Sequence, residues 1–267
     1  MKCIKTTLSN DIKQLEILPI SDLHIGTLEC CIGKIQDLIN RVRDNENTYC
    51  VLIGDIFDNS IIGSVGDVYE QDLTPMGQLA YGISLFEPIK HKILSVVQGN
   101  HEARSYKNTG IDLMGIFCAQ LGILDKYDPV ATCLFLRFGE MNSNTFSNGK
   151  RLSQKGKMPL YTIYSTHGIS GGRTVGAKAN ALERVSNVID SDICIVGHTH
   201  LPMTFRTNRY VVDAQNSSVY QKETIFINTA STQGYGGYAE KMSLKPSSMV
   251  NPRIILSGTM KKIEVVM

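Results

Sequence analysis

Residues 15–24 read LEILPISDLH, an apolar, strand-like run that ends on an aspartate and a histidine. Four further short motifs rich in Asp, Asn and His follow apolar runs in the same way. In chain order, the five motifs are Asp22-Leu23-His24, Gly54-Asp55-Ile56-Phe57-Asp58, Gly99-Asn100-His101-Glu102, Thr166-His167-Gly168 and Gly197-His198-Thr199-His200. They hold five of the six histidines. Because these residue types are common metal ligands, a two-metal hydrolase is the leading hypothesis.

Short β-branched runs alternate with amphipathic segments along the chain, which is typical of an α/β domain. Strands are expected at 15–20, 49–53, 92–97, 130–138, 160–165 and 193–196. Helical periodicity is found at 32–42, 76–86, 111–121 and 177–189. From residue 203 onward the pattern changes to strands and turns, with candidate strands at 210–213, 224–228, 253–256 and 261–266.

The recurring order of strand, motif and helix predicts that the five motifs lie together. In open α/β sheets, ligands bind in the crevice beyond the carboxyl ends of the strands. Each motif has a plainer interpretation when it is taken alone. The aspartates also suit helix caps or turns, His167 suits a buried hydrogen-bonded histidine, and Asn100 suits a turn. All five motifs in this order favour a single site instead.

Composition places few limits on function. The chain has 267 residues, of which 42% are hydrophobic and 19% charged, as in ordinary soluble globular proteins. Its formal net charge of +2 is too small to indicate a nucleic-acid or membrane partner by itself. No internal repeat or linker is found, so a single domain over residues 1–267 is expected. The sequence does not indicate an oligomeric state.

The cysteines and the apolar segments indicate a cellular compartment. The seven cysteines are scattered, odd in number and never spaced as Cys-x-x-Cys, so we expect reduced thiols. The N-terminus lacks the apolar core of a signal peptide, and no stretch approaches the roughly 18 apolar residues of a membrane span. These features predict a cytoplasmic protein that does not bind to membranes.

Taken together, the five motifs resemble those of the calcineurin-like metallophosphoesterases, whose pattern is D-x-H, G-D-x-x-D, G-N-H-[DE], H and G-H-x-H. Every element of the pattern is present between Asp22 and His200. Residues 227–231 resemble the Asn-Pro-Gly-Ser stretch that often follows in the family, with Thr229 and Ala230 in place of Pro and Gly. The resemblance implies a four-layer αββα sandwich of the α/β class, with two packed mixed β-sheets flanked by helices.

The resemblance also implies two sets of metal ligands that share Asp55. One metal would be held by Asp22, His24, Asp55 and His200, and the other by Asp55, Asn100, His167 and His198. Such oxygen and nitrogen donors suit manganese, which is favoured here, and also iron, zinc or nickel. Two divalent ions about 3.5–4 Å apart can share a water, lower its pKa and stabilise an in-line displacement at phosphorus. A bridging hydroxide is the expected nucleophile.

His101 directly follows Asn100, so it is expected beside the phosphoryl group as general acid or transition-state stabiliser. The resemblance makes Asp58 the carboxylate that orients this imidazole and favours its charged form. Glu102 is expected to have a structural role. His91, in the stretch Lys90-His91-Lys92, is expected to be a solvated residue between a helix and a strand.

Details of the motifs favour phosphodiester substrates. Protein Ser/Thr phosphatases usually continue the second motif with Arg-Gly, whereas Asp58 is followed here by Asn59 and Ser60. The ending His198-Thr199-His200 with Leu201-Pro202 is similar to that of phosphodiesterases and double-strand-break repair exonucleases. The expected substrate is therefore nucleic acid or a nucleotide. Those nucleases have long C-terminal capping regions that this chain lacks, so processive degradation of duplexes is not expected.

Several weaker features concern contacts with the substrate. Arg104 and Arg173 place cations on loops after the third and fourth motifs, where they would bind phosphate or remain solvated surface residues. A polar, basic loop insertion is expected at 139–158, either as a soluble loop or as a tip that contacts nucleic acid. Tyr235 and Tyr238 lie in a glycine-rich stretch and are candidates for stacking on bases, or for a turn with packed aromatics.

Two other functions remain open. A phosphomonoesterase or nucleotide phosphatase of the same fold would prefer terminal phosphates over internal diesters. A non-catalytic scaffold would keep the fold but would have lost its metals. Intact residues at all eight expected ligand positions, counting Asp55 once for each metal, disfavour the scaffold.

Overall fold

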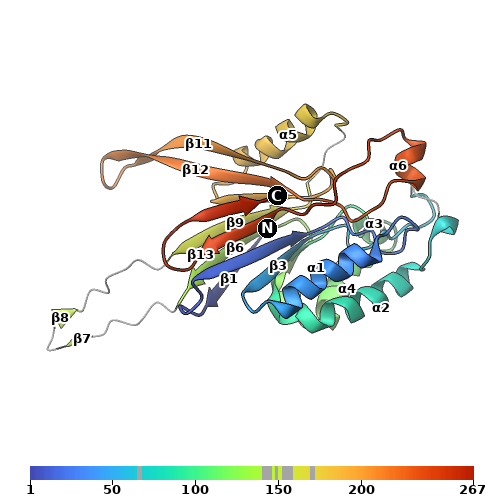
Figure 1. The fold of residues 1–267 in the computed structure, drawn as a ribbon, viewed down its shortest axis with the longest axis horizontal. Helices are drawn as coiled ribbons and strands as arrows, with labels where there is room; N and C mark the ends of the chain where they lie inside the picture. Colours follow the sequence, from blue (N-terminus) through green and yellow to red (C-terminus); the bar gives the residue numbers. More distant parts are fainter. Residues whose placement is uncertain (65–67, 140–145, 148–149, 152–158, 169–171) are drawn as a thin grey trace.

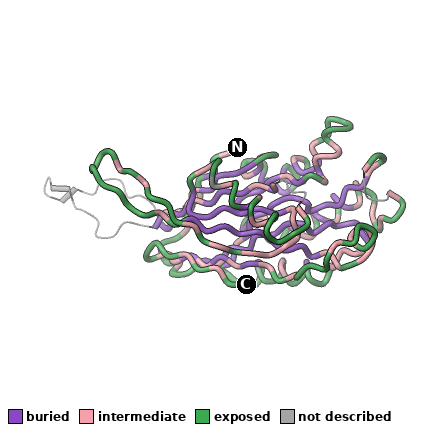
Figure 2. The backbone as a smooth tube through the Cα atoms, turned by 90° about the horizontal axis from the view of Figure 1, so that it is seen from above, coloured by how far each residue is buried: buried purple, intermediate pink, exposed green. Residues whose placement is uncertain are grey.

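The computed structural model describes residues 1–64, 68–139, 146–147, 150–151, 159–168 and 172–267. Two six-stranded sheets pack face to face, and helices cover their outer faces (Figure 1). The strands of both sheets are mostly buried, whereas the connections and the far end of the hairpin formed by β11 (Met203–Asp213) and β12 (Ser218–Asn228) are exposed (Figure 2). This arrangement is the four-layer αββα sandwich that the family resemblance implies.

The first sheet has the strand order β1-β6-β9-β10-β12-β11 and is mixed. Its strands are β1 (Lys2–Leu8), β6 (Ala131–Phe138), β9 (Leu160–Thr166), β10 (Ile193–Val196), β11 (Met203–Asp213) and β12 (Ser218–Asn228). Strands β9, β10 and β12 are parallel to one another. The carboxyl ends of β9 and β10 therefore reach the same edge of this sheet.

The second sheet has the order β14-β13-β2-β3-β4-β5 and is also mixed. Its strands are β2 (Gln14–Ile20), β3 (Thr48–Ile53), β4 (Ile93–Val97), β5 (Tyr127–Asp128), β13 (Arg253–Ser257) and β14 (Ile263–Val266). Strands β2 to β5 are parallel, whereas β13 and β14 join in antiparallel fashion. The parallel strands β2, β3 and β4 carry the first three motifs.

Strand β3 shows why the central strands are apolar throughout. Val51 and Ile53 belong to the core between the two sheets, while Cys50 and Leu52 belong to the core under the helices. Successive side chains of a strand point to opposite faces, and both faces of this sheet are covered. A continuous apolar run is the result.

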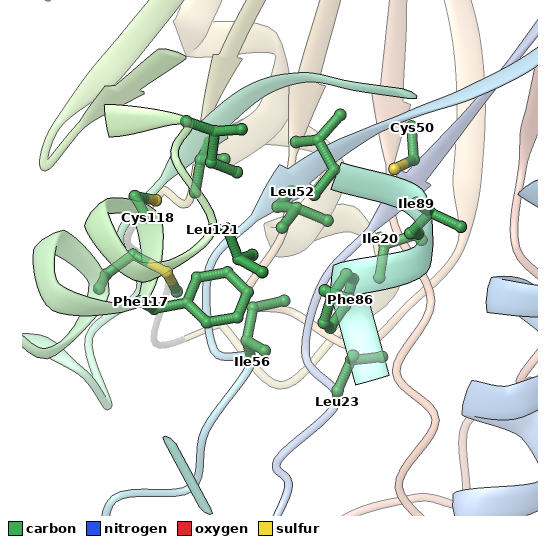
Figure 3. Close-up of a cluster of buried hydrophobic side chains, with 14 of the residues drawn as sticks. Ile20, Leu23, Cys50, Leu52, Ile56, Phe86, Ile89, Phe117, Cys118 and Leu121 are labelled. Carbon is green, nitrogen blue, oxygen red and sulfur yellow. The ribbon is translucent and has the colours of Figure 1, made fainter. Parts of the chain in front are cut away.

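The outer helices complete the sandwich. The helices on the second sheet are α1 (Ile32–Asp44), α2 (Pro75–Phe86) and α4 (Leu113–Gln120), and α5 (Val175–Glu183) covers the first sheet. Figure 3 shows Phe86 and Phe117 packed near Leu52 under these helices. The two rings meet edge to face with their centroids 5.6 Å apart, a favourable aromatic geometry.

The remaining elements are short. They are β7 (Phe146–Ser147), β8 (Lys150–Arg151), α3 (Ala103–Thr109), α6 (Gly237–Lys241) and the 3-10 helices η1 (Val68–Glu70), η2 (Glu87–Lys92), η3 (Leu124–Lys126) and η4 (Arg184–Asn187). Most of the loop insertion expected at 139–158 lies outside the described residues, as does the side chain of Tyr238. None of the helices in the described ranges is long and apolar enough to span a membrane.

The structure corrects several predicted boundaries. Strand β1 was not expected, because Ile4 is its single buried residue and the pattern is mostly polar. The helix expected at 177–189 is α5 followed by η4, and the strands expected at 210–213 and 224–228 are the ends of two 11-residue strands. Polar residues alternate along exposed hairpins, so these strands lack the apolar signal that marks buried ones.

Glu16 on β2 provides a pH-dependent contribution to stability. Its carboxylate accepts hydrogen bonds from Arg41 (2.9 and 2.8 Å), Thr48 (3.0 Å) and Arg253 (3.1 Å). Burial raises the pKa of Glu16, but these partners together hold it below its ordinary value. A pKa that is lower in the folded state stabilises the protein above the unfolded pKa, and this stabilisation is lost as the pH falls through the folded pKa.

We therefore expect Glu16→Gln to lower the free energy of unfolding by about 1 kcal/mol at neutral pH, after allowance for solvent screening. The difference from the wild type should shrink as the pH falls below about 4, near the pKa of glutamate in the unfolded chain. Urea denaturation over a pH series measures both effects, with Glu46→Gln at an exposed position as the control. A difference that is constant with pH would contradict the expectation.

Candidate metal centre

The motif residues lie where the parallel strands of both sheets end. Asp22, Asp55 and Asn100 follow β2, β3 and β4, and His167 and His198 follow β9 and β10. A contact between the two sheets fixes their ends together, because Nδ1 of His167 lies 2.6 Å from the backbone oxygen of Ile53. The predicted convergence of the motifs at one edge of the sandwich is therefore observed.

A first group of possible ligand atoms is formed by Asp22, His24 and His200. Nε2 of His200 lies 3.2 Å from Oδ1 of Asp22 and 3.2 Å from Nε2 of His24. Asp22 and His24 are buried, whereas the side chain of His200 is 29% exposed. Three possible ligand atoms therefore lie close together, and one of them belongs to a partly exposed side chain.

A second group of possible ligand atoms is formed by Asp55, His167 and His198. Nε2 of His167 lies 3.1 Å from Oδ2 of Asp55. Oδ1 of Asn100 lies 3.0 Å from this nitrogen and 2.8 Å from Nδ1 of His198. The four residues are those that the family resemblance assigns to the second metal.

The orientation of His167 fits a divalent cation. Its Nδ1 donates to the carbonyl of Ile53, so Nε2 is the nitrogen that faces Asp55 and Asn100. Burial lowers the pKa of His167, but Asp55 raises it to about 10, so a cation that binds at Nε2 takes the place of a proton there. A hydrogen bond from the distal nitrogen to a carbonyl is the usual way to orient a metal-binding imidazole. Carboxylate, imidazole and amide donors together suit transition metals.

The electrostatics of the site favour ionised carboxylates. Burial would raise the pKa of Asp22, but the neighbouring His200 lowers it to about 2. Burial opposes ionisation of Asp55 as well, and the charges of His167 and His101 hold its pKa well below the ordinary value. Burial and a nearby imidazolium lower the pKa of His24 and of His198. Ionised carboxylates and neutral imidazoles are the forms that bind metals.

Five of the possible ligands have a left-handed backbone. Their φ values are 51° for Asp22, 48° for His24, 50° for Asp55, 68° for His198 and 55° for His200. This conformation is uncommon for residues other than glycine, costs about 1–3 kcal/mol each and is concentrated at functional sites.

Backbone contacts between the motif loops hold these conformations. The backbone N–H of Asp22 donates to Gly54 and that of His24 donates to Asp55. A side chain at Gly99 would place its Cβ 2.1 Å from Oδ1 of Asp55, so the close approach of these two loops requires glycine there.

His101 and Asp58 are in contact, as the resemblance predicts. Nδ1 of His101 lies 2.7 Å from the backbone oxygen and 3.2 Å from Oδ1 of Asp58. The same carboxylate lies 3.4 Å from Nδ1 of His24 and accepts a hydrogen bond from Ser60 (2.5 Å). Burial lowers the pKa of His101, but Asp55 and Asp58 outweigh burial and raise it. Asp58 therefore orients a possible ligand and the adjacent imidazole together.

The two cations expected to bind substrate differ in position. Arg104 is partly buried and donates to the backbone oxygen of Asp58 (3.1 Å) and to Nε2 of His101 (3.0 Å). Arg173 is exposed and makes none of the contacts of this site within the part of the chain that the structure describes. Of the two arginines, the structure brings only Arg104 into the site.

Several supporting residues were not assigned a partner from the sequence. Glu102 accepts backbone N–H bonds from Asp55 (3.1 Å), Phe57 (2.9 Å) and Gly99 (2.9 Å), which fits the structural role expected for it. Burial and the charge of Asp55 raise the pKa of Glu102 to about 7. Asn59 donates to the backbone oxygen of His101 (2.7 Å). In the sequence, these contacts were indicated only by position: Glu102 ends the third motif, and Asn59 directly follows the second.

His91 lies outside the site, as expected. It is exposed and belongs to η2, directly before β4. Lys178 on α5 contacts the last motif. Its ammonium group donates to the backbone oxygen of Thr199 (2.7 Å), which lies between His198 and His200 in the sequence. This contact joins α5 to the last motif.

Solved structures similar to this chain include several phosphoesterases. A predicted phosphoesterase from Streptococcus pneumoniae TIGR4 is 14% identical with a TM-score of 0.37, over 95% of this chain and 89% of that chain. A metallophosphoesterase from Sphaerobacter thermophilus is 13% identical with a TM-score of 0.40, over 95% and 88%. A double mutant of Vps29 from Entamoeba histolytica is 14% identical with a TM-score of 0.39, over 94% and 98%.

Among curated proteins, none matches the sequence. A family model described as calcineurin-like phosphoesterase does match it, over residues 15–202. This range contains all five motifs and covers well over half of the 267 residues. The chain belongs to the calcineurin-like phosphoesterase family.

Proposed function

We propose that this protein is a two-metal phosphodiesterase that acts on nucleic acid or nucleotides, with manganese as the favoured metal. The observation that carries the proposal is the convergence of Asp22, His24 and His200 beside Asp55, His167 and His198, with Asn100 completing the second group. We assign Asp55 as the carboxylate shared by both cations. When bound, two divalent cations supply an activated water and neutralise charge on the phosphoryl group.

The side chains around the two groups supply the remaining functions. His101 is placed by Asp58 and by the hydrogen bond from Asn59 to its carbonyl, with Nε2 3.9 Å from Oδ2 of Asp55. A phosphoryl oxygen that enters the site competes with His101 for the N–H groups of Arg104. Once Arg104 binds that oxygen, Nε2 of His101, whose side chain is 18% exposed, is free to take up a proton from water. The resulting imidazolium, held at Nδ1 by Asp58, donates this proton to the leaving oxygen as general acid.

The surroundings of the site support a nucleotide diester over a phosphoprotein. Asn59 occupies the position at which protein phosphatases have arginine, and it is fully buried with its amide bound to His101 and Ser105. It is therefore closed to substrate. Arg104 on helix α3 supplies a cation beside His101 that can bind a phosphodiester oxygen.

A substrate screen tests the proposal. Purified protein with added Mn²⁺ is assayed on an aryl phosphodiester, the aryl monoester, nucleotide diesters, single- and double-stranded DNA and RNA, and phosphopeptides. Asp55→Asn serves as the blank. We expect the diesters, and nucleotide diesters most, to be cleaved faster than monoesters. Preference for the monoester would favour a phosphatase of the same fold, and a protein that binds no metal would favour the scaffold.

The proposed compartment is the cytoplasm. All seven cysteines are free thiols, and Cys50, Cys118, Cys133 and Cys194 are buried. Free thiols suit a reducing environment, which supports this assignment. Fractionation of cells that produce the natural protein, followed by immunodetection, would show whether it is found there.

Arg104→Ala is expected to lower kcat/KM for a phosphodiester by about 10- to 100-fold, because charge-assisted hydrogen bonds to phosphate contribute about 1.5–3 kcal/mol. Arg173→Ala should change it little, because Arg173 is exposed and away from the contacts of the site. Steady-state kinetics on the aryl diester measures both variants. A larger effect at Arg173 than at Arg104 would contradict this assignment.

A further inference from the structure

The segment 229–232 follows directly after β12, and its last two residues contact Asp22. The hydroxyl of Ser231 donates to the backbone oxygen of Asp22 (2.7 Å), and the backbone N–H of Thr232 approaches the same oxygen (3.3 Å). These residues lie beyond the range 15–202 that matches the family model. A possible metal ligand is thus held by a segment outside the motifs.

The side chain of Thr229 reaches the carboxylate of Asp22 through Ser21. The Ser21 hydroxyl donates to Oδ2 of Asp22, and its oxygen lies 2.5 Å from the hydroxyl oxygen of Thr229. A hydroxyl has one hydrogen to donate. Because Ser21 gives its hydrogen to the carboxylate, the hydrogen between the two hydroxyls comes from Thr229. The backbone oxygen of Val196, at 3.3 Å, is a second and more distant acceptor for the Thr229 hydroxyl. All three residues are at most 1% exposed, so bulk water does not compete for these bonds.

Because of these hydrogen bonds, the two carboxylate oxygens of Asp22 have different partners. Oδ2 accepts the hydrogen bond from Ser21, while Oδ1 lies 3.2 Å from Nε2 of His200. The backbone N–H of His198 is 3.1 Å from each oxygen and therefore does not distinguish them. The hydroxyls of Ser21 and Thr229 thus orient the carboxylate so that Oδ1 faces the first group of donors.

We infer that Thr229 is a positioning residue for the metal centre, acting through Ser21 to present Oδ1 of Asp22 to the cation that Asp22 shares with His24 and His200. This inference rests on the proposed function. The family's usual proline at this position has neither a hydroxyl nor an N–H. It provides neither the bond to Ser21 nor the backbone bond from Thr229 to Val196 (3.0 Å). The threonine therefore supplies a contact that the common sequence lacks.

The test measures metal affinity directly. Full-length protein freed of metal with a chelator is titrated with Mn²⁺ by calorimetry, as wild type, Thr229→Val, Thr229→Ser, Ser21→Ala and the double variant of Ser21→Ala with Thr229→Val. Loss of a partner behind a metal ligand typically weakens binding by about 10- to 100-fold. We expect that loss for Thr229→Val, and Thr229→Ser should bind nearly as tightly as the wild type.

A double-mutant cycle separates an effect through Ser21 from a general loss of packing. We expect Thr229→Val to add little to Ser21→Ala, because the hydrogen bond is already broken there. Thr132→Val is the matched control: within the described ranges its buried hydroxyl has no hydrogen-bond partner, and its removal should leave Mn²⁺ affinity unchanged. Thermal unfolding confirms that each variant is folded before titration.

The outcomes distinguish this inference from the proposed function. If the wild type binds Mn²⁺ and Thr229→Val binds it equally well, the inference is wrong and the proposed function stands. An equal loss from Thr229→Val in the wild-type and Ser21→Ala backgrounds would also overturn the inference. If Thr229→Val does not fold, an unchanged affinity in Ser21→Ala decides against it. A wild type that binds no Mn²⁺ would refute the proposed function itself.

Discussion

Replacing Asp55 by asparagine is expected to lower phosphodiester turnover by about 1000-fold, because cation stabilisation of the transition state contributes several kcal/mol and about 1.4 kcal/mol corresponds to a factor of ten. The carboxylate lies 3.1 Å from His167 and is assigned to both cations. Metal analysis of purified Asp55→Asn should show fewer bound ions per chain than in the wild type, and steady-state assays with added Mn²⁺ should show the loss of turnover.

The substitution suits this position because it preserves the backbone. Asparagine tolerates the left-handed conformation of Asp55, whose φ is 50°, better than most residues do. Its amide oxygen can still accept the hydrogen bond that the His101 backbone N–H donates to Oδ1 (2.9 Å). The variant should therefore fold normally. Unchanged metal content with full turnover would remove Asp55 from the proposed mechanism.

His101→Asn is expected to lower turnover by about 100- to 10 000-fold, the usual contribution of a positioned general acid. Metal content should stay that of the wild type, because His101 belongs to neither proposed ligand set and its Nδ1 faces Asp58 instead. Atomic absorption and steady-state kinetics on the same preparation test both parts of the prediction.

An exposed histidine provides the control for this variant. His91→Asn makes the same substitution at a histidine of η2 that lies outside the site, and it should leave both metal content and turnover unchanged. If His101→Asn loses metal and regains normal turnover when it is reloaded, His101 is a ligand and the general-acid role is wrong.

The sequence predicts the central fold well, because buried strands carry a strong apolar signal. The runs at 15–20, 49–53, 92–97 and 193–196 correspond to β2, β3, β4 and β10. The short helices α3 and α6 were missed, since each is too brief to show a clear period. Strand β1 was missed because an edge strand with one buried residue has little apolar pattern.

The candidate site follows a similar division. The motif residues were found because five motifs that combine aspartate, asparagine and histidine each follow an apolar run in the same chain. Ser21 and Thr229 were not assigned to the site, because serine and threonine are common and their contact joins positions 208 residues apart. From the sequence, Arg104 and Arg173 were equally good candidates for binding phosphate. Only the folded chain shows that, of these two arginines, Arg104 is the one that contacts His101.

The left-handed backbone of Asp22, His24, Asp55, His198 and His200 bears on any attempt to transplant this centre. Copying the side chains onto an ordinary helical or sheet scaffold would point them in other directions, because their aim comes from main-chain angles that few scaffolds offer. A designer would have to carry over the strand ends and the loops that brace them. The side chains alone would therefore not reproduce the centre without the backbone that orients them.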